Sequence, residues 1–141
     1  MSYKVFFDTN ILAYAFDQGS PKKNEQAKEL ISRWMPIGRM VISTQVLQEL
    51  FVVLTKKLEP RLSADNAGEV IESLLSLEVK VVETDTILKA INVSKENTIS
   101  FWDALIISSA IDSKCRVLFT EDLNRGQTIA GVKIENPFEE S

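Results

Sequence analysis

With 141 residues, 45% of them apolar and 26% charged, the chain has the size and composition of one soluble globular domain. It contains no histidine and one cysteine, Cys115, which excludes Ser-His-Asp and Cys-His catalytic groups, His-ligated zinc and an internal disulfide. The net charge of −4 weighs against broad binding to nucleic acid, which needs a basic surface. Catalysis would therefore have to use carboxylates, a lysine, a tyrosine, or a metal ion held by oxygen ligands.

Apolar strands alternate with helical patterns along the whole chain. The expected strands are 4–7, 39–43, 79–82, 116–119 and 132–134. The expected helices are 11–16, 22–35, 44–57, 64–77, 86–94 and 101–113. Because such alternation favours right-handed crossovers, we predict an α/β fold, a three-layer α/β/α sandwich around a parallel sheet of four to five strands.

No linker, repeat or low-complexity segment divides this pattern, so we expect a single domain over residues 1–141. Residues 1–4 lead directly into the first strand without a secretory signal, and no apolar run approaches the length of a membrane span. We therefore expect a cytoplasmic protein that does not bind a membrane.

The first strand is apolar from Val5 to Phe7 and is followed by Asp8, after which a helical pattern begins at once. An uninterrupted apolar strand is typical of the buried centre of a parallel sheet. Ligands of such sheets bind at the carboxyl ends of the strands. Asp8 is therefore a candidate site residue, although a carboxylate in this place can also simply cap the helix.

Two further carboxylates interrupt helices that are otherwise almost wholly apolar. Glu49 lies three residues after Val46 and three before Val52, so every side of that helix gives it apolar neighbours. A buried carboxylate must be neutral, paired or bound to metal, unless it reaches water at the rim of the helix. Asp103 opens the second such helix, where the spacing from Ser100 also suits a capping box.

A fourth carboxylate, Asp122, follows the fourth strand. If the first and fourth strands are neighbours, Asp8 and Asp122 lie at adjacent strand ends, with Glu49 and Asp103 on helices that can flank the same crevice. Four carboxylates in one place repel each other and require a cation. All-oxygen ligands suit Mg²⁺ or Mn²⁺, and such ions activate water and stabilise charge on a phosphodiester.

These motifs resemble the PIN domain family, in particular the small VapC-type toxins of toxin–antitoxin pairs. The resemblance covers nearly the whole chain, and its motifs stand in the family's order: the strand ending at Asp8-Thr9-Asn10, Ser43 before the helix of Glu49, Phe101-Trp102-Asp103-Ala104, and Thr120-Glu121-Asp122. It implies a Mg²⁺- or Mn²⁺-dependent endoribonuclease whose catalytic, metal-binding acids are Asp8, Glu49, Asp103 and Asp122.

The same resemblance implies two supporting residues: Asn10 beside the first acid and Thr120 beside the fourth. It also implies a homodimer and a cognate antitoxin that lies across the site. Glu121 lies next to Asp122, and the Thr-x-Asp spacing favours Asp122 as the acid that faces the metal.

Substrate contacts are open in the sequence. Arg125 and Gln127 follow the fourth acid and are candidates to contact RNA. The basic residues that could add positive charge are also explained as solvated surface: Lys22, Lys23, Lys56, Lys57 and Arg61. Trp102 could stack a base, but the start of an apolar helix favours a place in the core.

Several other functions are compatible with parts of the pattern. A haloacid-dehalogenase-like phosphotransferase would need a second aspartate where Asn10 stands, and a receiver domain would need its phosphoacceptor on a middle strand. A PIN-like module that binds RNA or protein without cleaving, or an RNA-processing nuclease outside a toxin–antitoxin system, remains as the alternative.

Overall fold

The computed structural model describes residues 2–123 and 126–138. The strands are β1 (Lys4–Phe7), β2 (Met40–Ser43), β3 (Glu78–Lys80), β4 (Cys115–Phe119), β5 (Thr128–Ile129) and β6 (Val132–Glu135). The helices are α1 (Thr9–Tyr14), α2 (Pro21–Trp34), α3 (Thr44–Lys56), α4 (Ala64–Leu74), α5 (Thr84–Asn97) and α6 (Phe101–Asp112), with a 3₁₀ turn, η1 (Met35–Ile37), after α2.

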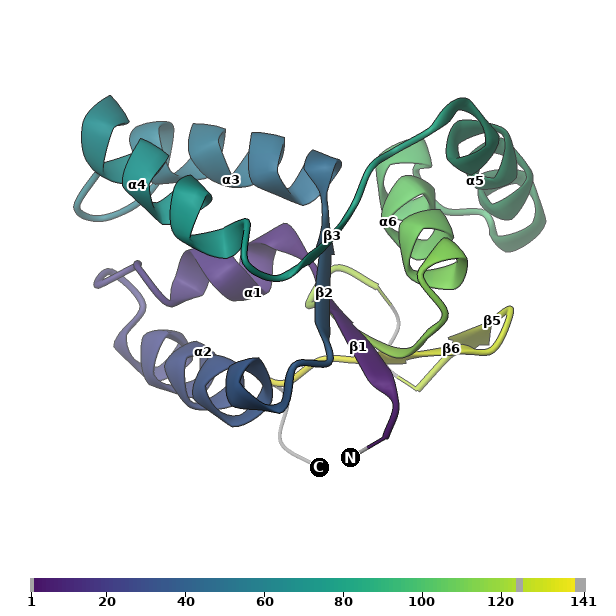
Figure 1. Cartoon of the computed structure of the whole chain (residues 1–141), viewed down its shortest axis with the longest axis horizontal. Coiled ribbons are helices and arrows are strands. Elements are labelled where there is room, and N and C mark those ends of the chain that lie inside the picture. The colour runs from purple at the N-terminus through teal and green to yellow at the C-terminus, as the bar shows by residue number, and fades with distance from the viewer. Residues whose placement is uncertain (1, 124–125, 139–141) are drawn as a thin grey trace.

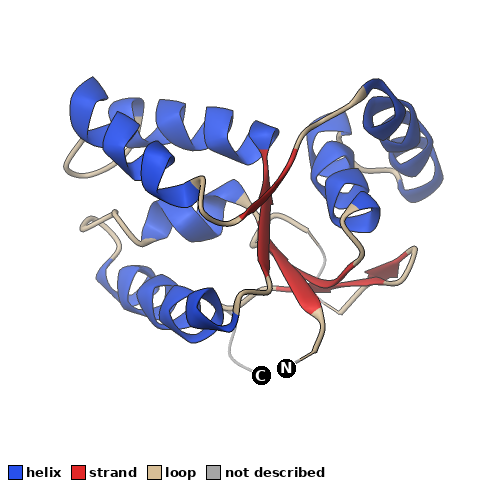
Figure 2. Cartoon of the chain, viewed as in Figure 1, coloured by secondary structure: helices blue, strands red, loops and turns tan. Residues whose placement is uncertain are grey.

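The sheet is six-stranded in the order β3-β2-β1-β4-β6-β5, and only β5 runs antiparallel to its neighbour. Figure 1 shows α1, α2, α3 and α4 to one side of the strands and α5 with α6 to the other, and Figure 2 shows the strands between the two groups of helices. This confirms the predicted α/β fold with helices on both faces of a mostly parallel sheet.

The apolar strands explain why the first one is central. Val5, Phe6 and Phe7 have no exposed surface, because β1 is paired with β2 on one edge and β4 on the other and is covered on both faces. The chain moves from β1 outward to β2 and β3, then returns to β4 on the opposite edge of β1. The strand order therefore reverses between β1 and β4, which is where open parallel sheets bind their ligands.

The sheet has one strand more than predicted. The short β5 pairs with β6 in a hairpin whose two-residue turn, Ala130-Gly131, has positive φ at both positions, 48° and 85°. Turns of this kind favour Asn-Gly or Asp-Gly, so Ala-Gly gave no hairpin signal in the sequence.

Most helix boundaries agree with the sequence, and Ser43, Ser63 and Ser100 accept hydrogen bonds as N-caps of α3, α4 and α6. Three helices differ from the prediction by two residues or more: α1 starts and ends two residues earlier, α4 ends three residues earlier, and α5 starts two residues earlier and ends three residues later. The N-cap of α5 is Glu83, held by a reciprocal hydrogen-bond pair with Thr86.

Candidate active site

A cleft of about 620 Å³ opens at the carboxyl ends of β1 and β4, where the strand order reverses. The backbone N–H of Asp8 donates to the carbonyl of Phe119, which ties the two strand ends together. All four carboxylates singled out in the sequence line this cleft. The lining residues are Asp8, Thr9, Asn10, Ala13, Tyr14, Asp17, Gln45, Gln48, Glu49, Val52, Val53, Lys57, Leu58, Trp102, Asp103, Ile106 and Asp122.

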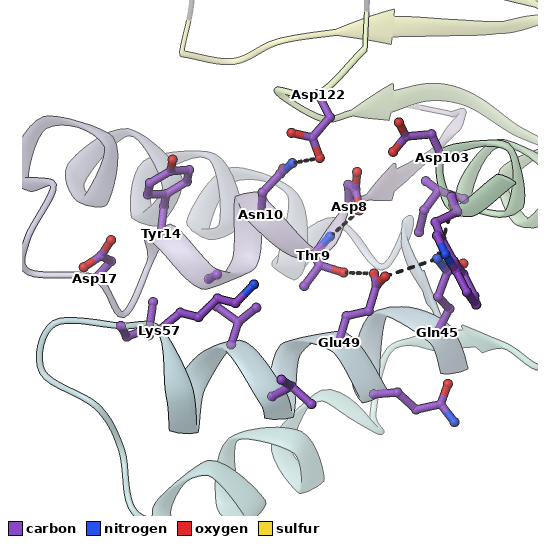
Figure 3. Close-up of a pocket in the computed structure, with 17 residues that line it drawn as sticks. Asp8, Thr9, Asn10, Tyr14, Asp17, Gln45, Glu49, Lys57, Asp103 and Asp122 are labelled. Carbon is purple, nitrogen blue, oxygen red and sulfur yellow. Dashed lines mark hydrogen bonds between the residues drawn. The ribbon is translucent and has the colours of Figure 1, made fainter. Parts of the chain in front are cut away.

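Figure 3 shows how these side chains are distributed. Asp8, Glu49, Asp103 and Asp122 gather toward one end of the view, while Tyr14, Asp17 and Lys57 lie toward the other. The four acids come from four separate segments: the end of β1, the middle of α3, the first turn of α6 and the segment after β4.

Asp8 is the most buried of the four acids, with 5% of its surface exposed. Its carboxylate accepts hydrogen bonds from the backbone N–H of Thr9 (2.6 Å) and from the hydroxyl of Thr120 (2.8 Å). The pKa of Asp8 is raised from 3.8 to about 7, mainly by burial. The two hydrogen bonds lower it, and the charges of Asp122 and Glu49 contribute to raising it. Asp8 therefore caps α1 and at the same time presents its carboxylate to the cleft.

Asp122 is exposed at the rim of the cleft. Burial raises the pKa of its carboxyl, as does the charge of Asp103, while a hydrogen bond from Asn10 Nδ2 (2.9 Å) lowers it. The supporting contacts are thus the reverse of those expected from the resemblance: Asn10 holds the fourth acid, and the Thr120 hydroxyl donates to the first. Thr120 also contacts the fourth acid, since its hydroxyl accepts from the backbone N–H of Asp122 (3.2 Å).

Glu49 projects from α3 and is half-buried. One oxygen accepts from the Thr9 hydroxyl (2.8 Å) and the other from Gln45 Nε2 (3.4 Å). The expectation that α3 is apolar-packed on every side was wrong, because Phe51 and Val52 are 38% and 51% exposed. No lysine or arginine among the described residues pairs with Glu49, which removes the buried salt bridge as an explanation within that part of the chain.

Asp103 lies in the first turn of α6, where its backbone N–H donates to the Ser100 hydroxyl (3.1 Å). Its carboxylate does not complete the capping box, since no described residue donates a hydrogen bond to it. The side chain is instead directed to the cleft, where Figure 3 shows it close to Asp122, consistent with its effect on the pKa of Asp122.

Glu121 does not line the cleft. Its carboxylate accepts from the Tyr14 hydroxyl (2.7 Å) and pairs with Lys23 (2.9 Å), whose ammonium also lies 4.9 Å from the Tyr14 ring centre. The two neighbouring acids after β4 therefore have different environments: Asp122 faces the cleft, and Glu121 joins α1 to α2.

The side-chain oxygens that line the cleft are suitable ligands for a hard divalent cation. Carboxylate oxygens are the preferred ligands of Mg²⁺ and Mn²⁺. Here they also repel one another, since the charges of Asp122 and Glu49 add to the effect of burial on the pKa of Asp8. Two buried amide oxygens in the wall, Asn10 Oδ1 and Gln45 Oε1, have no donor among the described residues. The described acids line the cleft without closing into a compact cluster of three ligands.

The predicted substrate contacts fare unevenly. Arg125 lies outside the described residues, and Gln127 does not line the cleft. Lys57 does line it and is the only cation among the described lining residues, whereas the other basic candidates, Lys22, Lys23, Lys56 and Arg61, do not.

Trp102 was expected in the core, and this expectation was wrong: the side chain is 63% exposed and lines the cleft. Thr9 and Gln45 also line the cleft and donate hydrogen bonds to Glu49, but neither was singled out from the sequence. Their positions carried a weak signal, since Thr9 adjoins Asp8 and Gln45 lies one helical turn before Glu49.

Comparisons with known proteins agree with this architecture. The model of the PIN domain family matches residues 5–127. A toxin–antitoxin complex from Klebsiella pneumoniae contains a chain that is 21% identical, with a TM-score of 0.73 over 97% of this chain and all of that one. A chain of a DNA-bound VapBC complex from Salmonella typhimurium is 24% identical, with a TM-score of 0.68 over 96% of this chain and 98% of that one. VapC20 of Mycobacterium tuberculosis, a toxin that cleaves the sarcin–ricin loop, is 18% identical, with a TM-score of 0.64 over 82% of this chain and 87% of that one.

The search of curated proteins returned no significant match. Within the described part of the chain, every helix is too short or too polar to span a bilayer.

Proposed function

We propose that this chain, which belongs to the PIN domain family, is a metal-dependent endoribonuclease and that residues 1–141 act as one nuclease domain. The observation that carries the proposal is the gathering of four carboxylates, from four separate segments, in one cleft at the point where the strand order reverses. A purely structural arrangement would pair these acids with cations, and the described lining residues include only one.

Asp8, Glu49, Asp103 and Asp122 would hold Mg²⁺ or Mn²⁺, and the bound ion would supply an activated water and stabilise charge on the phosphodiester. The chain's own contribution is to fix the orientation of these carboxylates. Hydrogen bonds from Thr120, Thr9 and Asn10 hold Asp8, Glu49 and Asp122, respectively. Because these donors are neutral, they orient the acids without cancelling the negative charge that attracts the cation.

RNA as the substrate is supported by the family and by the VapC toxin of similar fold, which cleaves the sarcin–ricin loop. We further propose that the chain is the toxin of a toxin–antitoxin pair in the cytoplasm, inhibited by a cognate antitoxin, and that it forms a homodimer. The structural neighbours support the antitoxin as partner, since several come from toxin–antitoxin complexes. A short neighbouring gene whose product co-purifies with the chain would support it, and a solitary gene would favour a role in RNA processing.

The proposal is tested by RNA cleavage. The purified chain should degrade RNA in the presence of Mg²⁺ or Mn²⁺ and lose at least about 100-fold of this activity in Asp8→Asn, since loss of one electrostatic group at a reacting centre has effects of this size. The matched control is Asp112→Asn, an acid of α6 outside the cleft, which should leave cleavage unchanged.

The outcome that would overturn the proposal is a folded protein that, with Mg²⁺ or Mn²⁺, cleaves no RNA on its own, or one whose Asp8→Asn variant cleaves as fast as the original. The alternative of a PIN-like module that only binds RNA or protein would then be favoured, provided that RNA or a protein partner still binds.

A further inference from the structure

Trp102 is the most exposed large apolar side chain of the described residues, and it lies in the wall of the acidic cleft. Among the described aromatic residues, Phe101 alone contacts its ring, edge to face, with ring centres 5.2 Å apart. The other tryptophan, Trp34, is 4% exposed and packs against Tyr3 and Phe119. The chain therefore has one tryptophan in the core and one presented to solvent beside the carboxylates.

The position of Trp102 relative to the acids is set by backbone contacts. Ser100 caps α6 and fixes its first turn, in which Trp102 precedes Asp103. The carbonyl of Trp102 accepts a hydrogen bond from Gln45 Nε2 (3.2 Å), and the same amide group contacts Glu49. The backbone of Trp102 is therefore connected to two of the four acids: Asp103 is the next residue in the chain, and Gln45 bridges to Glu49.

We propose that Trp102 stacks an unpaired nucleobase of the substrate. This inference rests on the proposed function, since it deepens the substrate class of the same site. Base–aromatic stacking tolerates any base, because every base has an apolar face. A base within a duplex is already stacked and would have to leave its partner first.

The chemistry of the cleft favours a nucleotide over a protein segment as the occupant of this face. A nucleotide carries its phosphate and its base as adjacent groups, and the cleft presents carboxylates for a phosphate-bound cation next to an indole for a base. A protein segment would need an apolar side chain and a basic one at the right spacing to cover the indole and pair with Asp103, whereas a nucleotide with its cation brings both features as one unit. Trp102 is therefore a specificity residue of the cleft, distinct from the acids that hold the metal.

Kinetics test this assignment. Trp102→Ala should raise the KM for single-stranded RNA about tenfold with little change in kcat, and Trp102→Phe should recover most of the loss because it restores an aromatic face. Leu88→Ala is the matched control, because Leu88 is 60% exposed on α5 and does not line the cleft. If the original chain cleaves RNA and Trp102→Ala cleaves it with unchanged KM, the inference fails while the proposed nuclease function stands.

A second measurement is independent of cleavage. In Trp34→Phe, Trp102 is the only tryptophan, so its fluorescence reports directly on the cleft. A single-stranded oligonucleotide should quench it, whereas an abasic oligonucleotide of equal length and a duplex should quench it much less. Equal quenching by the intact and abasic strands, no quenching by either, or quenching only by a protein partner would each overturn the inference.

Discussion

Two groups of carboxylates in this molecule have opposite environments. At the carboxyl end of α6, Asp112 accepts hydrogen bonds from Thr86 (2.9 Å) and Lys89, and Lys80 lies 3.9 Å away. Burial alone would raise the pKa of Asp112, but the hydrogen bonds and positive charges outweigh it and hold the pKa below its usual value. The amino end of the same helix carries Asp103, which contributes to the acidic cleft.

The cleft shows the reverse. Among the described residues, neutral groups alone donate hydrogen bonds to Asp8 and Asp122, and the pKa of each acid is raised. The difference does not lie in the residue type, since aspartates occupy both places. It lies in whether the fold brings a cation into contact with the acid: Lys89 pairs with Asp112, whereas no described lysine or arginine pairs with Asp8 or Asp122.

The largest expected effect of this difference is on stability against pH in the absence of metal. Asp8 has a folded pKa of about 7 and an ordinary value of 3.8, so between these pH values the folded state keeps a proton that the unfolded state has lost. The contribution of Asp8 to the free energy of unfolding is therefore largest below pH 4. It falls by at most about 4 kcal/mol as the pH rises to 7. Urea unfolding between pH 4 and 8 measures this loss.

Asp8→Asn isolates the contribution, because the variant has no charge to bury and should lose less stability over the same range. Asp112→Asn should have the opposite sign: the stability that Asp112 contributes is present at neutral pH and disappears in acid, so this variant is destabilised at pH 7, by less than about 1 kcal/mol given the exposure of Lys89. Parallel pH profiles of the original chain and Asp8→Asn would refute the contrast.

The next effect is stabilisation by metal. A ligand that binds only the folded state at 100 times its Kd adds about 2.7 kcal/mol, which raises the Tm of a chain of this size by about 10 °C. We expect this rise with Mn²⁺, its loss in Asp8→Asn and its persistence in Asp112→Asn. A rise of equal size in both variants would mean that the ion binds elsewhere.

The sequence predicted the order of the elements and the place of the acids for a simple physical reason. Residues 5–7 of β1 form an uninterrupted apolar run, which is typical of a buried central strand. A carboxylate directly after such a strand lies at the carboxyl end of the sheet. Once β1 is central, the return of the chain to β4 brings Asp8 and the segment of Asp122 together. These relations depend on backbone topology, which apolar patterns reveal.

The partners of the acids could not be predicted in the same way. Which of Thr120 and Asn10 contacts which acid depends on side-chain directions at the ends of β4 and α1, and the sequence contains no period that reports them. Trp102 escaped for a related reason. The first turn of an apolar helix has positions on every side, and only the packing of α6 against its neighbours decides which one faces solvent.

The smallest expected effect concerns the contribution of Lys57 to RNA binding in the cleft. Lys57 is the one cation among the described lining residues of the cleft, it makes no ion pair with any described residue, and Figure 3 places it toward the end away from Asp103 and Asp122. Because its ammonium forms no ion pair with a described acid, it is available to a neighbouring phosphate of a bound strand. Lys57→Ala should therefore raise the KM for RNA about threefold and make it less sensitive to salt.

Lys56→Ala provides the control, because Lys56 precedes Lys57 in the chain, is equally charged and exposed, and does not line the cleft. KM values measured from low to moderate salt separate the two variants, since a lost phosphate contact reduces the salt dependence whereas a loss of stability does not. Equal KM values and equal salt slopes for the two variants would show that the cleft binds its substrate without this cation.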